Sequence, residues 1–354
     1  MKILIITASL GCGGAERVVA QLANEWVATG NEVTVLLVRE NEVFYWVDPD
    51  VRIRFLETKK KKTISSKLAW MRGVRRFVSR SRPDVVLSLP EEIGIYVALA
   101  LVGKPTKLVV SERNNPYVMP YKKITRLLRR LAYRFVDGFI FQSEAAAGFF
   151  PKAIRRRSVV LDNPLDLSRI PPRFEGERDK RIVSVSRLEK QKNIRLLLDG
   201  FALFSERHPD YRLEIYGDGN LRGELEEYAK TLKGSDAVCF MGRRDDVLEK
   251  IRCASAFVLS SDFEGVPNAL IEAMACGVPS VSTDFDPSGA SVVIEDGKNG
   301  LIVPKNDPAA LSAALEKLLD PDLSPSFSEN ALTIKGRVDA HTVAAKWLDF
   351  LGKE

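Results

Sequence analysis

Short runs of apolar residues alternate with longer amphipathic segments along almost the whole chain. Short apolar runs bounded by turn residues are typical of buried strands, and their alternation with helical periods predicts βα units around a parallel sheet. The pattern therefore predicts an α/β protein built from two doubly wound parallel sheets. The expected strands are 2–8, 32–38, 51–56, 84–89, 107–111, 138–142, 158–161, 181–186, 211–216, 238–241, 256–259, 279–282 and 300–303.

Two proline clusters interrupt this alternation near the middle of the chain, between Asn163-Pro164 and Pro171-Pro172. Proline breaks helices and central strands, so this segment is the expected linker. We expect a first domain over residues 1–163, a second over 164–337, and a helix over about 338–354 that crosses back over the first. Two doubly wound sheets of this kind face one another across a ligand cleft at their strand ends.

Charge divides the chain into two unlike halves. The net charge of +6 combines +13 over residues 1–163 with −7 over the remainder. A basic half favours contact with an anionic surface or ligand. The run Lys59–Lys62 has no interleaved aromatic side chains on which bases would stack. We therefore expect an anionic membrane surface as a partner and no nucleic acid.

The hydropathy pattern and the cysteine content bear on where in the cell the protein is located. The longest nearly uncharged stretch, 93–103, is far shorter than the ~20 residues of a spanning helix. Glu16 and Arg17 follow the apolar start too early for a signal peptide, and the four cysteines form no CxxC pair. Widely spaced cysteines are typical of a reduced compartment. We expect a cytoplasmic protein that is peripheral on the cytoplasmic face of the inner membrane.

A glycine-rich segment, 11–16, directly follows the first expected strand and opens a helix. Gly13 and Gly14 let the backbone approach a phosphate or a sugar, and the helix N-terminus adds N–H groups and partial positive charge. The spacing is not that of a dinucleotide fingerprint. A plain tight turn is the other interpretation.

A second group of residues follows successive strands in the second half. Arg187 ends one expected strand, Lys192 lies at the start of the next helix, and Gly217 ends another strand. Because the carboxyl ends of parallel strands meet at one edge of a sheet, we expect these residues to lie together. Each charge alone is better explained by an ion pair or a solvated surface. Their grouping favours a site for an anionic ligand.

Two carboxylates stand seven residues apart in 264–272, Glu-Gly-Val-Pro-Asn-Ala-Leu-Ile-Glu. Pro267 suits the first turn of a helix, which puts Glu264 in the preceding loop and Glu272 on the helix. One carboxylate would then meet a sugar and the other a ribose diol. Arg187 and Lys192 would cancel the charge of a leaving diphosphate, which is the role of a metal ion in other sites.

These motifs resemble those of the family 4 retaining glycosyltransferases of GT-B fold, and the likeness covers nearly the whole chain. The resemblance implies a nucleotide-sugar donor, expected to be a UDP-sugar, and no metal or other cofactor. It implies three catalytic residues, Arg187, Lys192 and Glu264, with the first two on the diphosphate and Glu264 at the transferred sugar. The donor-binding residues that it implies are Gly13, Gly14, Gly217, Gly265, Val266, Asn268 and Glu272.

The sequence departs from the family pattern in two places. Many members carry a histidine near the donor sugar where this chain reads Ser111-Glu112-Arg113. Members often show two glycines and then an acid where this chain has 288–292, Ser-Gly-Ala-Ser-Val. The identity of the donor sugar is therefore open.

A basic amphipathic helix is expected over Tyr121–Asp137. At ~100° per residue its apolar residues share one face and its bases the other. The likeness is strongest to members that add N-acetylgalactosamine to polyprenyl-pyrophosphate-linked oligosaccharide in bacterial N-glycosylation, where a comparable helix holds the carrier's pyrophosphate. A solvated basic helix is the alternative. The implied acceptor-binding residues are Glu112, Arg113, Lys122, Lys123, Arg126, Arg129, Arg130 and Arg134.

The expected activity is transfer of a hexose or N-acetylhexosamine from a nucleotide-sugar to a polyprenyl-pyrophosphate-linked glycan, with retention. A transferase for a soluble sugar acceptor is one alternative. A non-catalytic GT-B scaffold of a membrane glycan pathway is another, although a scaffold has no need for Arg187, Lys192, Glu264 and Glu272. We interpret the three Asp-x-Asp sequences at 48–50, 284–286 and 320–322 as turns rather than metal ligands.

Overall fold

The computed structural model describes residues 1–11, 13–56, 64–287 and 289–353. Cys12 of the glycine-rich segment, the Lys59–Lys62 run and Ser288 lie outside these ranges. The chain forms two compact units, one made of residues 1–166 and 338–354 and the other of residues 167–337. All thirteen expected strands are present, and each bound agrees with the expectation to within two residues.

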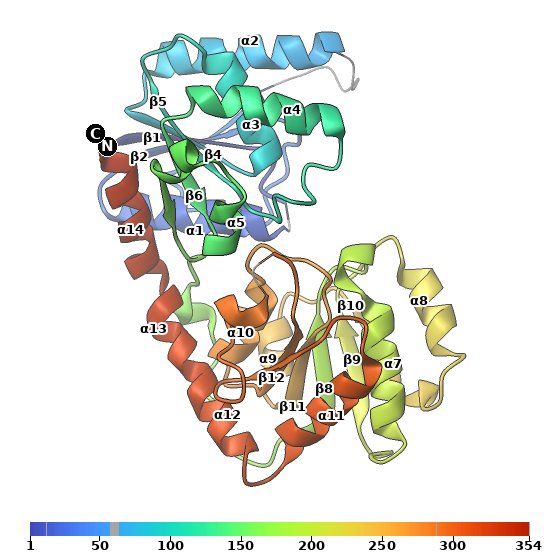
Figure 1. Ribbon diagram of the computed structural model, residues 1–354. Coiled ribbons are helices and arrows are strands. Elements are labelled where there is room, and N and C mark those ends of the chain that lie inside the picture. The colour runs from blue at the N-terminus through green and yellow to red at the C-terminus, as the bar shows by residue number, and fades with distance from the viewer. Residues whose placement is uncertain (12, 57–63, 288, 354) are drawn as a thin grey trace. The chain divides into compact units, whose positions relative to one another are not determined.

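The first unit is built on a seven-stranded parallel sheet with the order β3-β2-β1-β4-β5-β6-β7 (Figure 1). The order reverses between β1 and β4, so the residues after these two strands flank a topological switch point. The strands are β1 (Lys2–Thr7), β2 (Glu32–Leu37), β3 (Arg52–Phe55), β4 (Val85–Ser88), β5 (Lys107–Ser111), β6 (Gly138–Phe141) and β7 (Ser158–Val160).

Helices cover both faces of this sheet, which is why its strands are almost continuously apolar. Along β1, Ile3 and Ile5 join one buried cluster with residues of α1 and α14, whereas Leu4 and Ile6 join the cluster under α2 and α3. Trp26 of α1 donates a hydrogen bond to the carbonyl of Ala344 in α14 at 3.0 Å. The helices are α1 (Gly14–Ala28), α2 (Ile64–Ser81), α3 (Glu91–Leu101), α4 (Lys123–Ala132), α5 (Glu144–Gly148), α6 (Lys152–Arg155) and α14 (Ala340–Gly352).

The second unit contains a six-stranded parallel sheet with the order β10-β9-β8-β11-β12-β13. Its order reverses between β8 and β11, which places a second switch point there. The strands are β8 (Asp179–Val185), β9 (Arg212–Tyr216), β10 (Val238–Gly242), β11 (Ala254–Leu259), β12 (Ser280–Thr283) and β13 (Leu301–Val303).

Helices α7 and α11 pack on one face of the second sheet through a buried cluster that includes Ile182, Ile215 and Val258. Strand side chains alternate between the two faces of a sheet, and the alternate residues Val183 and Phe257 are also fully buried. Both faces of the second sheet are therefore covered. The helices are α7 (Ile194–Ser205), α8 (Arg222–Ala229), α9 (Val247–Ile251), α10 (Asn268–Ala275), α11 (Pro308–Leu319), α12 (Ser324–Ala331) and α13 (Lys335–Val338).

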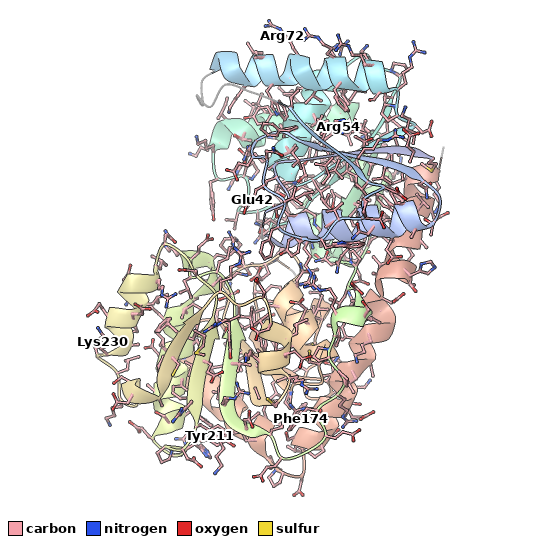
Figure 2. All side chains as sticks on the ribbon, turned by 180° about the vertical axis from the view of Figure 1, so that it is seen from behind. Glu42, Arg54, Arg72, Phe174, Tyr211 and Lys230 are labelled. Carbon is pink, nitrogen blue, oxygen red and sulfur yellow. The ribbon has the colours of Figure 1, made fainter. Side chains whose placement is uncertain are left out.

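Long charged side chains project from the outer helices of both units, as Arg72 on α2 and Lys230 after α8 illustrate (Figure 2). Within the described ranges, none of the helices is both long enough and apolar enough to cross a membrane.

Candidate active site

Lys192 and Glu264 form an ion pair at the switch point of the second unit. The side chains are 15% and 8% exposed, so the pair is largely removed from water. The Ser261 hydroxyl donates to the same carboxylate oxygen at 2.6 Å, and Gln191 donates to the other oxygen at 3.4 Å. A buried charge pair with this many hydrogen bonds is held in one geometry. Lys192 and Glu264 were predicted as site residues from the sequence, whereas Ser261 and Gln191 were not.

The backbone around Lys192 explains why these distant residues meet. Lys192 ends the short 3₁₀ helix η3 (Lys190–Lys192), and its carbonyl accepts a hydrogen bond from Ser260, just after β11, at 2.8 Å. Asn193 then adopts a left-handed conformation at φ 44° and caps α7 with its side chain. Residues following β8 and β11 are thereby joined across the point where the sheet order reverses.

Arg187 also follows β8, but its surroundings differ from those of Lys192. Its side chain is 60% exposed, and its described partner is Glu189 at 3.1 Å. An exposed ion pair of this kind contributes little to stability. The guanidinium can therefore turn to an anionic ligand at low energetic cost.

Gly217 follows β9 in a conformation that only glycine adopts easily, with φ of +128°. A Cβ atom here would lie 1.9 Å from the backbone oxygen of Ser186. The turn after β9 therefore packs directly against the residue that precedes Arg187, and Gly217 is required for this close approach.

The loop that carries Glu264 is tied by main-chain hydrogen bonds to the segment that follows β12. The Glu264 N–H donates to the carbonyl of Asp286 at 3.0 Å. Pro267 is the N-cap of α10 rather than a residue of its first turn, and Asn268 opens the helix. Glu272 lies on α10 and is 8% exposed. Both glutamates are thus buried, Glu264 in the loop before α10 and Glu272 in the middle of that helix.

The Asp-x-Asp sequence at 284–286 is engaged in local structure. Asp286 pairs with Lys305 at 2.8 Å, and Asp284 lies beside Gly289, where a Cβ atom would come within 2.2 Å of its Oδ1. In the part of the chain that the structure describes, no group of three His, Cys, Asp or Glu residues is placed to hold a metal ion.

In the first unit, Gly13 and Gly14 lie where β1 leads into α1. Gly13 is the N-cap, and Gly14 is the exposed first residue of the helix. A Cβ atom on Gly13 would approach the Glu16 carboxylate to 2.1 Å, so the turn is crowded on that side. The segment presents the N-terminal turn of a fifteen-residue helix at the switch point.

Glu112 follows β5 and belongs to a buried polar cluster. The Tyr133 hydroxyl donates to its carboxylate, and Arg129 lies 3.8 Å from the other carboxylate oxygen. Burial raises the pKa of Glu112 to about 8 and outweighs the attraction of Arg129. Burial likewise raises the pKa of the neighbouring Glu91. This cluster was not predicted, because Tyr133 and Glu91 are far from Glu112 in the sequence.

Arg113 borders this cluster, and its backbone N–H donates to the Glu91 carboxylate at 3.3 Å. Its guanidinium donates to the Asn163 side chain and lies 5.8 Å from the ring of Trp347. Its Nε and Nη1 are buried and have no hydrogen-bond partner in the described structure. Burial lowers the pKa of Arg113 to about 10, although Glu91 and Glu16 favour its charged form.

The structure corrects the expected arrangement of the basic helix. Arg129 is 3% exposed, donates to the carbonyls of Met119 and Pro116, and stacks on Phe149 and Phe150. It holds the preceding loop in place, so it does not belong to a solvated basic face.

Arg126 is also engaged, because it donates to the carbonyls of Val118 and Pro120. The helix itself is shorter than expected and passes into the 3₁₀ helix η1 (Tyr133–Phe135). The remaining expected bases are exposed, namely Lys122, Lys123, Arg130 and Arg134.

The exposed side of α4 and η1 carries large apolar side chains instead. We call them the apolar strip: Ile124, Leu127, Leu131 and Phe135, which are 62%, 52%, 44% and 52% exposed. At ~100° per residue, the bases Lys123, Arg130 and Arg134 lie directly beside this strip. The buried side of the helix is formed by residues including Thr125, Arg129 and Ala132.

Two family models match the chain and together cover both units. The model described as glycosyltransferase family 4 matches residues 12–169, and that described as glycosyl transferases group 1 matches residues 170–333. A relative from Campylobacter jejuni serotype O:2 is 30% identical over 100% of this chain and 99% of its own length. The protein belongs to the group 1 glycosyltransferases of family 4. It is therefore a retaining glycosyltransferase that uses a nucleotide-sugar.

That relative is named as the α-1,4-N-acetyl-D-galactosaminyltransferase that acts on GalNAc-α-(1→4)-GalNAc-α-(1→3)-diNAcBac-PP-undecaprenol. A second Campylobacter jejuni enzyme is 29% identical over 99% of both chains. Its name is N-acetylgalactosamine-N,N'-diacetylbacillosaminyl-diphospho-undecaprenol 4-alpha-N-acetylgalactosaminyltransferase.

Solved structures establish the fold of this glycosyltransferase. The Anabaena protein HepE in complex with UDP and glucose superposes with a TM-score of 0.84, at 18% identity and 100% coverage of both chains. Sucrose-phosphate synthase from Thermosynechococcus elongatus gives 0.86 at 15% identity, over 99% and 98% of the two chains. The two parallel sheets are thus those of the GT-B fold.

Proposed function

We propose that this protein transfers a hexose or N-acetylhexosamine from a UDP-sugar to a glycan carried on polyprenyl pyrophosphate, at the cytoplasmic face of the inner membrane. The apolar strip of α4, exposed beside a row of bases, is the observation that carries the acceptor assignment. The diphospho-undecaprenol acceptors in the names of the two Campylobacter jejuni relatives support it.

The second unit supplies the donor side of the proposed reaction. Arg187 and Lys192 would contact the diphosphate, with Gly217 allowing the backbone turn beside them. Glu264 would contact the transferred sugar, and Glu272 the ribose. The bound UDP of HepE supports the choice of nucleotide. The remaining donor contacts that we propose are Gly13, Gly14, Gly265, Val266 and Asn268.

The chemistry proposed at this site needs one new bond and one broken bond. The acceptor oxygen bonds to the anomeric carbon on the face from which the diphosphate leaves. The bond between that carbon and the phosphate oxygen breaks, and the departing phosphate oxygen takes the acceptor proton. Two cations beside the diphosphate stabilise the charge that develops there. Because they stand in for a divalent ion, we expect turnover to persist in excess chelator.

The acceptor side would be formed by the first unit. The exposed bases Lys122, Lys123, Arg130 and Arg134 would contact the pyrophosphate of the carrier, because phosphate oxygens accept several charge-assisted hydrogen bonds at once. Glu112 and Arg113 remain proposed acceptor residues, with Glu112 acting from the buried cluster. A helix that is basic and apolar on its exposed side lies flat in a membrane interface.

The experiment compares two acceptors that carry the same glycan, one on polyprenyl pyrophosphate in vesicles and one free in solution. Nucleotide release is measured for wild type, for Leu127→Glu with Leu131→Glu, and for Leu203→Glu as a matched control. Leu203 lies on α7 and is 40% exposed, close to the 44% of Leu131. The proposal requires a loss of at least ~10-fold on the lipid-linked acceptor in the strip variant alone. Equal rates on both acceptors in all three proteins would favour a soluble acceptor.

A further inference from the structure

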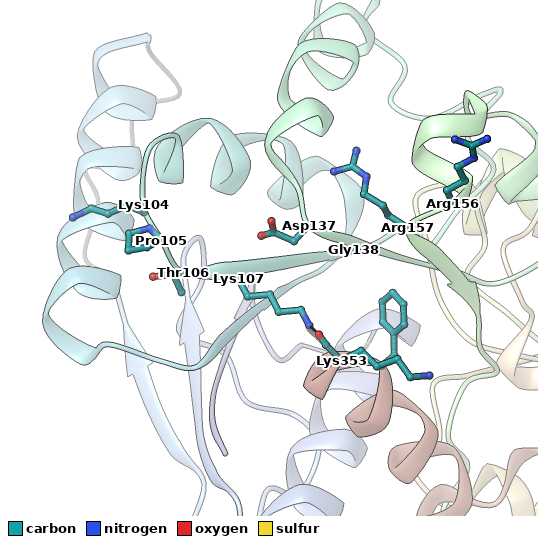
Figure 3. A pocket seen from close by; sticks show the side chains of 10 residues that line it. Lys104, Pro105, Thr106, Lys107, Asp137, Gly138, Arg156, Arg157 and Lys353 are labelled. Carbon is teal, nitrogen blue, oxygen red and sulfur yellow. Dashed lines mark hydrogen bonds between the residues drawn. The ribbon is translucent and has the colours of Figure 1, made fainter.

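A cavity of about 500 Å³ lies at the N-terminal ends of β5 and β6 (Figure 3). Gly13 and Glu112 follow strand carboxyl ends, so this cavity lies at the other edge of the sheet from the proposed site. Four segments line it: 104–107 at the start of β5, 137–138 at the start of β6, 156–157 before β7, and part of the C-terminal segment. Its walls therefore come from parts of the chain that only the fold brings together.

The lining is strongly basic. Five of its ten residues are lysine or arginine, and one, Asp137, is acidic. The Asp137 carboxylate accepts a hydrogen bond from the backbone N–H of Leu108 at 2.7 Å, so part of its capacity to accept hydrogen bonds is already used. The five bases are Lys104, Lys107, Arg156, Arg157 and Lys353.

Two of these bases, Lys104 and Arg156, have no side-chain hydrogen bond or ion pair among the described residues. The others are held in place around the cavity. Arg157 donates to the carbonyl of Val136 and lies over the ring of Phe139, while Lys107 donates to the backbone oxygen of Lys353. Like charges gathered in a concave site repel one another unless an anion lies among them.

Phosphate matches this arrangement, because its oxygens accept hydrogen bonds from several bases at once. The wall at Phe350 adds an apolar ring beside the bases. A ligand with a phosphate and an adjoining apolar part therefore fits the lining better than a small inorganic anion does.

Asp137, which lines the cavity, is two residues after Phe135, the last member of the apolar strip. When a helix lies flat in a membrane interface, its ends are at the depth of the lipid headgroups. We propose that this cavity binds the phosphate of an anionic phospholipid headgroup while the apolar strip contacts the bilayer. This inference rests on the membrane part of the proposed function and adds a second, separate contact.

The test uses vesicles of phosphatidylcholine, with or without phosphatidylglycerol, and neither donor nor acceptor. The cavity variant is Lys104→Glu with Arg156→Glu. Its matched control is Lys317→Glu with Lys346→Glu, which makes the same change in net charge at two exposed residues outside the cavity. We expect flotation to show a loss of about tenfold or more in binding to phosphatidylglycerol vesicles for the cavity variant, beyond the loss of the control. Equal losses of vesicle binding in both variants would mean that only net charge matters, and would overturn the assignment of this cavity as a headgroup site.

Two further measurements separate the sources of phosphate and the two membrane contacts. Titration calorimetry with inorganic phosphate and with glycerol 1-phosphate tests the soluble source. Tight binding of either, lost in the cavity variant while vesicle binding is kept, would overturn the lipid assignment. The strip variant Leu127→Glu with Leu131→Glu should lose binding to both kinds of vesicle. If it binds both like wild type, the membrane part of the proposed function fails, whatever the cavity variant does.

Discussion

Lys192 and Glu264 are seventy-two residues apart in the chain and form a buried ion pair after two adjacent strands of one sheet. Their strands, β8 and β11, are neighbours only because the strand order reverses between them. Ser261 and Gln191 complete the pair with hydrogen bonds. This geometry fixes a cation and a carboxylate side by side, so removing either one should change both turnover and stability.

Replacing Lys192 by alanine should have two effects. Turnover should fall ~10² to 10³-fold, because one preorganised charge is lost. Unfolding free energy should fall by about 3 kcal/mol, because Glu264 stays buried without its cation. The exposed neighbour Lys190 provides the control, and Lys190→Ala should change neither. Adding Glu264→Gln to Lys192→Ala should restore most of the stability but not the turnover, and a stability loss that persists would contradict the pairing energy.

Arg187 should separate activity from stability. Its side chain is 60% exposed and pairs only weakly with Glu189, so Arg187→Ala should leave the melting temperature unchanged. Turnover should nevertheless fall ~10²-fold. Glu189→Gln is the matched control and should keep nearly full turnover. Wild-type rates in Arg187→Ala would remove this residue from the diphosphate site.

The two glutamates should differ in what they bind. Calorimetry with UDP should show weaker binding for Glu272→Gln, whose proposed partner is the ribose. Glu264→Gln should bind UDP nearly as wild type does while its turnover falls, because its proposed partner is the reacting sugar. Unchanged UDP affinity in Glu272→Gln would refute the ribose contact.

Gly217→Ala tests the turn that packs beside Arg187. A Cβ atom there would meet the Ser186 backbone oxygen at 1.9 Å in a left-handed conformation, so we expect a loss of roughly 2 kcal/mol or more in stability, together with turnover. Gly223 is the control, because it lies in α8 with no atom within 4 Å of its added Cβ. Gly223→Ala should stabilise by up to ~1 kcal/mol. Equal melting temperatures for the two variants would contradict the proposed constraint.

Glu112 should make the stability of the protein depend on pH. Its pKa of about 8 in the folded state lies above that of the unfolded chain, so the folded state holds its proton over a wider range. The unfolding free energy should therefore fall as pH rises from about 5 to about 8. Denaturant titrations should show this fall in wild type and a smaller one in Glu112→Gln, with some slope remaining from Glu91. Stability that rises across this window would mean that Arg129 keeps Glu112 ionised.

The sequence alone predicted the fold class and the strand bounds of this protein, because both depend on local residue patterns. Buried strands of a doubly wound sheet are apolar on both faces, so the strand bounds could be found from short apolar runs. The motifs at Gly13, Arg187 and Glu264 stand in loops that follow strands, and parallel strands align their carboxyl ends. This rule was enough to predict that Arg187, Lys192 and Gly217 would stand at the same edge of the second sheet.

The tertiary structure decided what local pattern could not. Helical periodicity separated the apolar and basic faces of α4, but periodicity does not say which face meets the protein. The loop before α4 provides carbonyls and the segment after α5 provides aromatic rings that satisfy Arg129, so Arg129 is buried and the apolar strip is left outside. Likewise, the basic cavity at β5 and β6 joins residues from 104 to 353. A side chain's burial depends on partners that are distant in sequence, and only the fold brings them to it.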